Sequence, residues 1–276
     1  MKHTIHSLIV FLLVLGLKQN LSAQETSDPT QELSAAELAK KAQNPIANMI
    51  SVPFQNNTNF GIGPNDRSQN ILNIQPVVPV NLGKWNLINR VIAPVISQPD
   101  YSTESDSKFG LGDIVYQGFF TPASGGKVTW GIGPVAILPT ATHESLGSGK
   151  WSAGPAAVVV AFAGKFVLGG VAYNAWSFAG DSNRDDVSQG FLQYFINYNM
   201  PKAWYITSAP SITANWKAPE GDKWIVPFGG GVGKIFAIGN QKLNGQVSAY
   251  SNAVKPETLD GPDWTLRAQL VFMFPK

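Results

Sequence analysis

Two short motifs contain residue types that could support catalysis or phosphate binding. His143 stands two residues before Ser145, and an imidazole base beside a serine hydroxyl is the arrangement that activates a nucleophile. The pair follows Pro139 and precedes a glycine-rich stretch, so we expect it in a loop, where a solvated histidine is the ordinary occurrence. Residues 229–234 (GGGVGK) are glycine-rich, but they lack the P-loop spacing and the Ser or Thr that follows its lysine. We therefore expect no enzyme activity, no cofactor and no metal site.

A second set of candidates consists of charged and polar residues inside segments that alternate between apolar and polar side chains. Facing lipid at mid-membrane would cost Arg or Lys about 2–4 kcal/mol, so in strands of a membrane barrel these side chains belong in the lumen. The alternation does not settle the phase of Arg90 and Lys234. Either internal salt bridges hold the wall together, or a narrow pore slightly prefers anions. The predicted pore-lining residues are Arg90, Asp113, Gln117, Gln193, Asn197, Lys234, Arg267 and Gln269.

The composition favours a chain that is in contact with an apolar solvent. Only 14% of the 276 residues are charged, whereas about 25% is usual in soluble domains. Aromatic residues make up 11%, which argues against disorder, and a net charge of only +2 argues against nucleic-acid binding. The absence of cysteine excludes a disulfide scaffold, a cysteine zinc site and a thiol nucleophile.

The N-terminal part of the chain begins with a targeting segment. Residues 1–23 have a basic start, an apolar stretch and small residues before Gln24, which is the pattern of a cleaved secretory signal peptide. The apolar stretch is too short to span roughly 30 Å of hydrocarbon, and no later stretch reaches the length of a membrane-spanning helix. Loss of the signal takes Lys2 and Lys18 from the 20 basic residues and leaves them equal in number to the 18 acidic ones.

Residues 24–48 form a polar segment between the signal peptide and the alternating region. We expect a short helix from Thr30 to Ala42, because a capping box stands near its start and Pro45 follows its end. The segment is either a mobile periplasmic tail or a plug that contacts the rest of the chain or a partner.

From Met49 onward the side chains alternate with period two, which is typical of strands with one apolar and one polar face. Near the C-terminus, for example, Leu266 and Leu270 alternate with Arg267 and Gln269. The segments exceed the usual strand of about 5–6 residues and match the roughly 9–11 residues that a tilted strand needs to cross a bilayer. The alternative is a soluble β-sandwich, which would also alternate. The predicted strands are residues 49–58, 70–82, 85–97, 110–121, 127–139, 150–162, 165–178, 188–200, 203–216, 223–236, 241–253 and 263–274.

The connections between these strands are predicted to alternate between long and short, as in bacterial outer-membrane barrels with long outer loops and short periplasmic turns. Tryptophans stand near the segment ends, where amphipathic rings collect at membrane interfaces. Acidic residues outnumber basic ones in the long connections. They either keep the loop tips soluble or bind divalent cations that bridge lipopolysaccharide, since carboxylates are hard oxygen ligands. An even number of strands places both termini in the periplasm.

Several runs of residues resemble one family of bacterial proteins. They are Asn44-Pro45 and residues 51–54 (SVPF), 85–90 (WNLINR), 110–113 (GLGD), 130–134 (WGIGP), 147–151 (GSGKW), 226–234 (VPFGGGVGK) and 261–264 (GPDW). The family is the outer-membrane "transporter" group, similar to the phenol-degradation, MetA-pathway-like barrels, some of whose members carry the name "neuromedin U". The resemblance covers roughly residues 44–276 and implies a barrel that takes up small compounds, aromatic ones among them. It supplies no catalytic residues.

The last predicted strand also resembles the C-terminal signal of outer-membrane barrels, which commonly ends in an aromatic residue. Here Pro275-Lys276 follow that residue, which departs from the pattern. The resemblance implies that the barrel-assembly machinery recognises this strand.

The expected fold is an all-β, transmembrane, antiparallel up-and-down β-barrel of about 12 strands over residues 49–276, with a short N-terminal helix or tail. The expected function is the passive passage of small solutes, aromatic or weakly polar, across the outer membrane of a Gram-negative bacterium. Two alternatives remain open: a closed barrel with a structural or surface-interaction role, and a barrel lipid hydrolase that uses His143 and Ser145. The second resembles outer-membrane phospholipase A. The expected partners are outer-membrane lipids, lipopolysaccharide, the barrel-assembly machinery and a small solute, with no nucleic acid.

Overall fold

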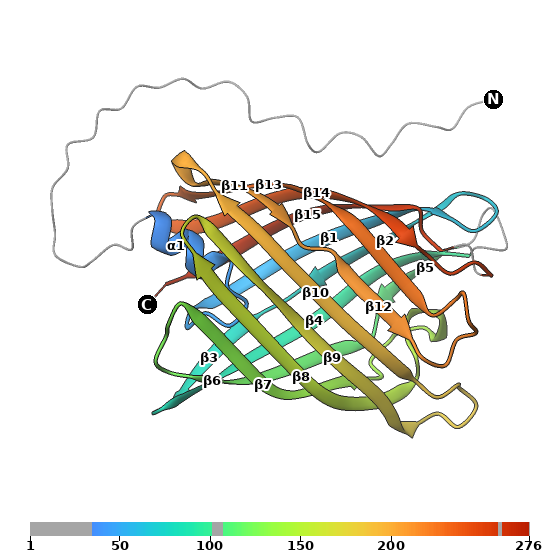
Figure 1. Ribbon diagram of the computed structural model, residues 1–276. Helices are drawn as coiled ribbons and strands as arrows, with labels where there is room; N and C mark the ends of the chain where they lie inside the picture. Colours follow the sequence, from blue (N-terminus) through green and yellow to red (C-terminus); the bar gives the residue numbers. More distant parts are fainter. Residues whose placement is uncertain (1–34, 101–106, 259–260, 276) are drawn as a thin grey trace, which may run out of the picture. The chain divides into compact units, whose positions relative to one another are not determined.

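The computed structural model describes residues 35–100, 107–258 and 261–275. These residues form a barrel of antiparallel strands, preceded by a short helix, α1 (Ala35–Ala42) (Figure 1). The predicted signal peptide and the first part of the polar segment, through residue 34, lie outside the described residues. Among the described helices, none has the length and hydropathy that crossing a bilayer requires.

Fifteen strand segments make up the barrel. Three barrel strands are each divided into two segments (β2 with β3, β5 with β6, and β11 with β12), so the barrel has twelve strands, as predicted. The segments are β1 (Ile50–Ile62), β2 (Arg67–Ile74), β3 (Val77–Leu82), β4 (Trp85–Pro99), β5 (Ser107–Leu111), β6 (Ile114–Pro122), β7 (Val128–Leu138), β8 (Lys150–Ala163), β9 (Phe166–Gly180), β10 (Ser188–Asn199), β11 (Trp204–Ser208), β12 (Ser211–Asn215), β13 (Trp224–Ile238), β14 (Gln241–Val254) and β15 (Trp264–Phe274). Two one-turn 3₁₀ helices, η1 (Glu144–Leu146) and η2 (Pro201–Ala203), lie in connections.

Pairing between the first and last strands closes the barrel. β1 and β15 are antiparallel in a continuous register from Ile50 opposite Phe274 to Phe60 opposite Trp264. Every other barrel strand pairs with its neighbours in sequence. A closed sheet leaves no edge with unpaired N–H and C=O groups, which is the condition for a sheet in hydrocarbon. The predicted closed, up-and-down topology is therefore confirmed.

The divided strands break where the ladder of backbone hydrogen bonds is interrupted. Two of the breaks lie directly before Pro76 and Pro210, and proline has no N–H to donate to a neighbouring strand. The third lies at Gly112-Asp113, where the hydroxyl of Thr140 accepts the N–H of Ile114 (2.9 Å) and donates to the carbonyl of Gly112 (3.0 Å). The predicted strands 70–82, 110–121 and 203–216 are thus present but interrupted.

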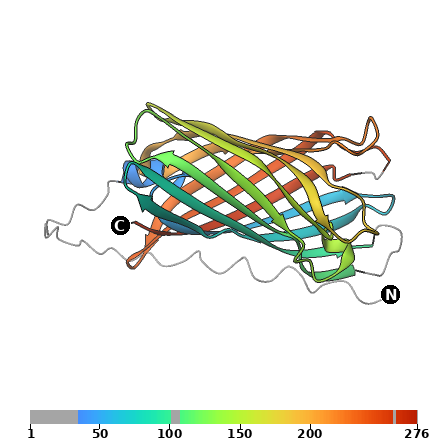
Figure 2. The ribbon, with the colours of Figure 1, turned by 90° about the horizontal axis from the view of Figure 1, so that it is seen from below.

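The two ends of the barrel differ. α1, the C-terminus and the turns at 83–84, 164–165 and 239–240 lie at one end, and the connections 139–149 and 181–187 lie at the other (Figures 1 and 2). We call these the turn end and the loop end. One prediction is corrected: β1 continues to Ile62, so the connection to β2 is only residues 63–66 rather than a long loop at 59–69.

Two belts of tryptophan surround the outer face. All eight tryptophans are between 40% and 50% exposed. Three lie at the turn end (Trp85, Trp130 and Trp204) and five at the loop end (Trp151, Trp176, Trp216, Trp224 and Trp264). Apolar side chains are exposed between them, among them Ile132, Val247 and Leu270. An apolar band between two aromatic belts is typical of a barrel that crosses a bilayer.

The inner face is not uniformly polar. Along β3, β4 and β6–β10 the inward side chains form a buried apolar cluster with Ile46 from the N-terminal segment. We call this cluster the apolar inner wall; its members include Val77, Ile88, Phe119, Val135, Val158, Val160, Val167, Val171 and Phe195. Polar inward residues lie mainly on β1, β2, β14 and β15, such as Asn57, Asn73, Gln246 and Gln269. One side of the lumen is therefore packed as in a soluble protein.

The outer face generates a stability prediction. Val247 lies at the middle of β14 and is 47% exposed, whereas Val254 ends the same strand at the loop end and is 44% exposed. Because a cation on the lipid face costs about 2–4 kcal/mol at mid-membrane and about 0–1 kcal/mol near the interface, Val247→Arg should lower the free energy of unfolding far more than Val254→Arg. Urea unfolding in lipid vesicles measures both. Equal losses would contradict the proposed depth of these residues.

Candidate functional site: the barrel lumen

Three cavities follow one another through the barrel. A vestibule of 1320 Å³ lies at the loop end, a middle cavity of 390 Å³ follows, and an inner chamber of 150 Å³ lies towards the turn end. The vestibule and the middle cavity share Phe191 and Thr213 as lining residues, and the middle cavity and the inner chamber share Gln55 and Arg267. The cavities are therefore contiguous.

The N-terminal segment forms the turn-end boundary of the inner chamber. Residues 41–45, Ala47 and Met49 line this chamber. Leu38 and Met49 are buried in a second apolar cluster that includes Tyr205 of β11. Gln43 and Asn199 exchange amide hydrogen bonds of 2.9 and 3.2 Å. The predicted helix is present from Ala35 to Ala42, and its segment is docked rather than a free tail.

Arg267 crosses the lumen between the middle cavity and the inner chamber. Its Nε donates to the side-chain oxygen of Asn57 (2.8 Å), and its Nη1 donates to the carbonyl of Ala209 (2.8 Å). That carbonyl precedes Pro210 at the break between β11 and β12, and it also accepts a bond from Gln193 Nε2 (3.3 Å). The guanidinium lies 4.9 Å from the centre of the Tyr250 ring. Arg267 lies on β15 and Ala209 at the break between β11 and β12, and β13 and β14 separate these strands in the sheet. The side chain of Arg267 therefore spans part of the pore.

Arg90 lines the inner chamber from β4. Its Nη2 donates to Gln75 Oε1 (2.6 Å) and its Nη1 to Gln117 Oε1 (3.3 Å). Gln117 has no exposed surface, and its Nε2 has no hydrogen-bond partner. Arg90 is thus held by two neutral amides, one of them next to the break at Pro76.

No strand of the described barrel contains an aspartate or a glutamate. The ion pairs found among the described residues include Lys150–Asp186 (3.4 Å) and Lys255–Asp263 (2.7 Å), both at the loop end. Arg90 and Arg267 bond only to neutral groups in this part of the chain. The lumen charges were interpreted either as internal salt bridges or as the cause of an anion preference. Among the described residues, neither arginine forms a salt bridge.

Three other predicted pore-lining residues, Gln193, Asn197 and Gln269, also line the inner chamber. Gln117 was predicted to line the pore as well, but it is fully buried and lines none of the three cavities. Lys234 does not line them either. It lies on the outer face near the turn end, with its Nζ 5.0 Å from the centre of the exposed Trp204 ring. Gly233, the preceding residue, faces the chamber residue Tyr205, so the period of the strand turns Lys234 outward, where its ammonium group can reach the membrane interface.

Asp113 is also displaced from its predicted position, because the break between β5 and β6 brings it to the loop end. Its Oδ2 accepts the backbone N–H (2.7 Å) and the hydroxyl (2.9 Å) of Ser148, and its Oδ1 accepts the N–H of Ala141 (3.3 Å). Asp113 lies outside the three cavities and anchors the connection 139–149.

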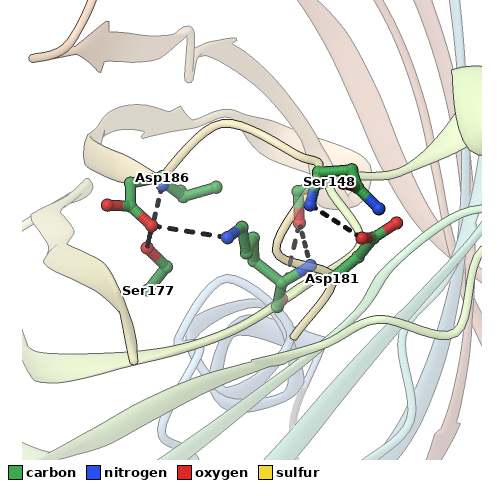
Figure 3. A network of polar contacts seen from close by, with 7 residues as sticks. Ser148, Ser177, Asp181 and Asp186 are labelled. Carbon is green, nitrogen blue, oxygen red and sulfur yellow. Dashed lines mark hydrogen bonds and ion pairs between the residues drawn. The ribbon is translucent and has the colours of Figure 1, made fainter. Parts of the chain in front are cut away.

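A polar network joins this connection to the next one (Figure 3). The carboxylate of Asp186 accepts the hydroxyl of Ser177 (3.3 Å) and pairs with Lys150. The N–H of Asp181 donates to the carbonyl of Gly149 (3.0 Å). Arg184 adds bonds from Nη2 to the carbonyls of residues 144 and 147 (2.9 and 2.6 Å). The connections 139–149 and 181–187 are thus held together beside the vestibule.

Two further loop-end connections meet at Asp222, which lines the vestibule. Its Oδ1 accepts the N–H groups of Glu257 (2.8 Å) and Thr258 (2.9 Å). Hydrogen bonds from Thr258 lower the pKa of Asp222, and the neighbouring Lys223 lowers the pKa of Glu220 through a hydrogen bond and its charge. Both carboxylates therefore stay ionised to a lower pH than free ones, and Asp222 links its connection to residues 255–258.

His143 and Ser145 are close together, with 3.0 Å between Nδ1 and Oγ. The same Nδ1 accepts the backbone N–H of Ser145 (3.2 Å), so the imidazole caps the exposed η1 turn. Among the hydrogen bonds of the described residues, none joins a carboxylate to this ring. The described residues also contain no group of three or more His, Asp or Glu side chains placed to hold a metal ion.

Sequence reasoning missed several residues that line the inner chamber or the middle cavity. Gln75, Tyr205 and Gln246 line the chamber, and Tyr250 lines the middle cavity with its hydroxyl unpartnered. The alternation along β14 already placed Gln246 on the polar face of its strand. No sequence signal marked the docking of residues 43–49.

The comparisons with known proteins support the fold. No family model and no curated protein matches the chain. The structure is similar to the COG4313 outer membrane channel from Pseudomonas putida F1, with a TM-score of 0.62 and 16% identity over 82% of this chain and 94% of that one. It is less similar to the P. putida toluene transporter TodX (TM-score 0.39, 9% identity, 86% of this chain and 93% of that one). CdiB from Acinetobacter baumannii also has a TM-score of 0.39, with 9% identity over 82% of this chain and 60% of that one. The first similarity establishes the barrel fold that the family resemblance implied.

The loop contacts generate a prediction on local stability. Asp113→Asn keeps the side-chain volume but removes the negative charge of a carboxylate that accepts three hydrogen bonds. Hydrogen bonds to a charged group contribute about 1.5–3 kcal/mol. Amide hydrogen exchange in residues 140–148 should become about tenfold faster or more. Asp185→Asn, in the neighbouring connection, is the matched control. Unchanged exchange in the Asp113 variant would show that the carboxylate does not anchor the loop.

Proposed function

We propose that this protein is a passive channel for small solutes in the outer membrane of a Gram-negative bacterium. The row of three contiguous cavities through a closed barrel is the observation that carries the proposal. The apolar band between two tryptophan belts supports a membrane location. The fold similarity and the predicted signal peptide support the outer membrane, with both termini and the turn end in the periplasm.

The expected solutes are small because the pore is narrow. Twelve strands lie between the eight-stranded barrels that side chains fill and the sixteen-stranded porins that leave an aqueous channel. Here the apolar inner wall occupies one side of the lumen, and Arg267 crosses part of the rest. The remaining surface offers amide side chains and an apolar face, which suits weakly polar compounds. No nucleotide motif is present, so passage follows the concentration gradient.

The charge of the lumen favours anions. Arg90 and Arg267 are fixed cations, and the strands that carry them contain no acid. A permeating anion therefore replaces water around these groups with favourable charge interactions, whereas a cation meets only positive charge. The acidic loop residues lie at the loop end, outside the narrow part of the pore.

Residues 35–49 act as a plug in this proposal. They bound the inner chamber at the turn end, and the bonds between Gln43 and Asn199 hold them there. The alternative of a closed, structural barrel requires that this segment never leaves. The two functions differ only in whether the turn end opens.

Conductance in a planar bilayer tests the channel and the plug. Refolded residues 24–276 should give discrete current steps, and removal of residues 24–47 should enlarge the conductance several-fold because the boundary of the inner chamber is lost. Cross-linking of a Gln43→Cys, Asn199→Cys pair with a short bis-maleimide, which adds to both thiols, is the converse test and should keep the conductance low; the absence of native cysteine makes it specific. Silence of both the full and the shortened protein, each shown to be folded, would favour the structural role.

The sign of the reversal potential in a salt gradient tests the anion preference. Arg267→Glu should shift the preference towards cations, because it replaces a fixed lumen cation by an anion. Lys234→Glu makes the same change of charge on the outer face of the barrel and should leave the selectivity unchanged. Equal reversal potentials for the wild type and the Arg267 variant would exclude a role of this residue in selectivity.

A further inference from the structure

We infer that the inner chamber binds a small monocarboxylate with an apolar body of about six carbon atoms, with the carboxylate on Arg90. The inference rests on the proposed function, since this ligand is a solute in passage. It adds a chemical class that neither the fold nor the anion preference specifies.

The polar half of the site is the Arg90 guanidinium, some of whose N–H groups have no hydrogen-bond partner among the described residues. Its guanidinium makes two hydrogen bonds, and a guanidinium has five N–H donors, so donors remain for a ligand. The bond to Gln117 is long, at 3.3 Å, and is at the weak end of the normal range. Arg90 and Gln75 line the inner chamber, whereas Gln117 is fully buried behind its lining.

A carboxylate in the chamber completes the bonding of Arg90. Its oxygens accept N–H groups of the guanidinium that the bonds to Gln75 and Gln117 leave free. Guanidinium and carboxylate match in planar geometry and charge. A neutral carbonyl compound lacks the charge, so it gains less from the same contacts.

The apolar half of the site lies beside Arg90 on the apolar inner wall. Val77 is opposite Arg90 in the register between β3 and β4, and Val77, Val171 and Phe195 all line the inner chamber. The chamber volume is 150 Å³, and an engineered apolar cavity of about 150 Å³ holds benzene. A small inorganic anion can pair with Arg90 but gains nothing from these apolar side chains, whereas the apolar body of a carboxylate is buried against them.

A carboxylate that moves from the loop end towards the inner chamber first passes Arg267 and Tyr250, which line the middle cavity. Tyr250 is buried in the middle cavity, and its hydroxyl has no partner in the described structure. Arg267 borders both this cavity and the inner chamber. A carboxylate that enters from the loop end therefore meets one arginine with an unpartnered donor before it reaches the other.

Calorimetric titration of the refolded protein, residues 24–276 in detergent, tests the site with four probes: benzoate, hexanoate, the neutral isostere benzamide and chloride. Benzoate and hexanoate should bind at least about tenfold more tightly than benzamide. Arg90→Gln should weaken benzoate binding about tenfold and benzamide binding by much less, since only benzoate loses a charge interaction. Lys234→Gln, on the outer face, controls for charge and for partition into the micelle and should bind benzoate like the wild type.

Each outcome bears on one proposal. Equal affinity for benzoate and benzamide, or benzoate binding that Arg90→Gln leaves unchanged in a folded barrel, overturns the carboxylate site, even if the protein conducts ions. Arg90→Lys is the second variant if Arg90→Gln does not fold; it keeps the charge but not the planar fork and should still lose affinity. Selective benzoate binding by a barrel that stays silent in bilayers both with and without residues 24–47 supports the site and refutes the channel.

Discussion

Backbone hydrogen bonding in the barrel wall is the constraint on which the rest of the structure depends. A wall in contact with hydrocarbon must pair all its N–H and C=O groups, and the closing register of β1 with β15 completes that pairing. Pro76 and Pro210 interrupt the ladders of two strands. At the Pro210 break, Arg267 and Gln193 donate from the lumen to the carbonyl of Ala209. At the Pro76 break the backbone stays paired within the wall, since the N–H of Gln75 donates to the carbonyl of Pro53 (2.8 Å) and the carbonyl of Pro76 accepts the N–H of Val91 (3.1 Å). Arg90 donates there to the side chain of Gln75, so each lumen arginine bonds to the residue that precedes one of the two prolines.

At Arg267 this dependence explains why the arginine is held without a carboxylate. A carboxylate partner would neutralise the charge of Arg267 but could not donate a hydrogen bond to the carbonyl of Ala209. Neutral carbonyl and amide acceptors hold each guanidinium in place and leave its charge without a carboxylate partner among the described residues. A single arrangement thus stabilises the wall and sets the electrostatic character of the lumen.

Period-two alternation allowed most of the barrel to be predicted from the sequence. On β10 and β15 one face is clearly polar, and Gln193, Asn197, Arg267 and Gln269 line the chamber as the pattern indicated. The pattern fails where both faces have similar side chains. Residues 229–233 are mostly glycine, so the sequence does not indicate which face of the strand Lys234 occupies, and Lys234 lies on the outer face. Along β8 and β9 the apolar inner wall and the lipid face both require apolar residues, so these strands show no alternation. Asp113 was misplaced for a different reason: a break in the ladder took it out of the strand.

The apolar inner wall links the N-terminal segment to the pore. Ile46 belongs to the same buried cluster as Val77 and Phe195, so the segment contributes to the core of the barrel rather than resting on its rim. Undocking residues 43–49 would expose that part of the wall to water, which opposes opening, since apolar burial is favourable roughly in proportion to area. A ligand with an apolar body covers part of the same surface from the chamber side. Because residues 41–45 also line this chamber, a bound ligand contacts the docked segment and favours the docked state. Release of a solute at the turn end therefore requires that the ligand and the segment lose these contacts together.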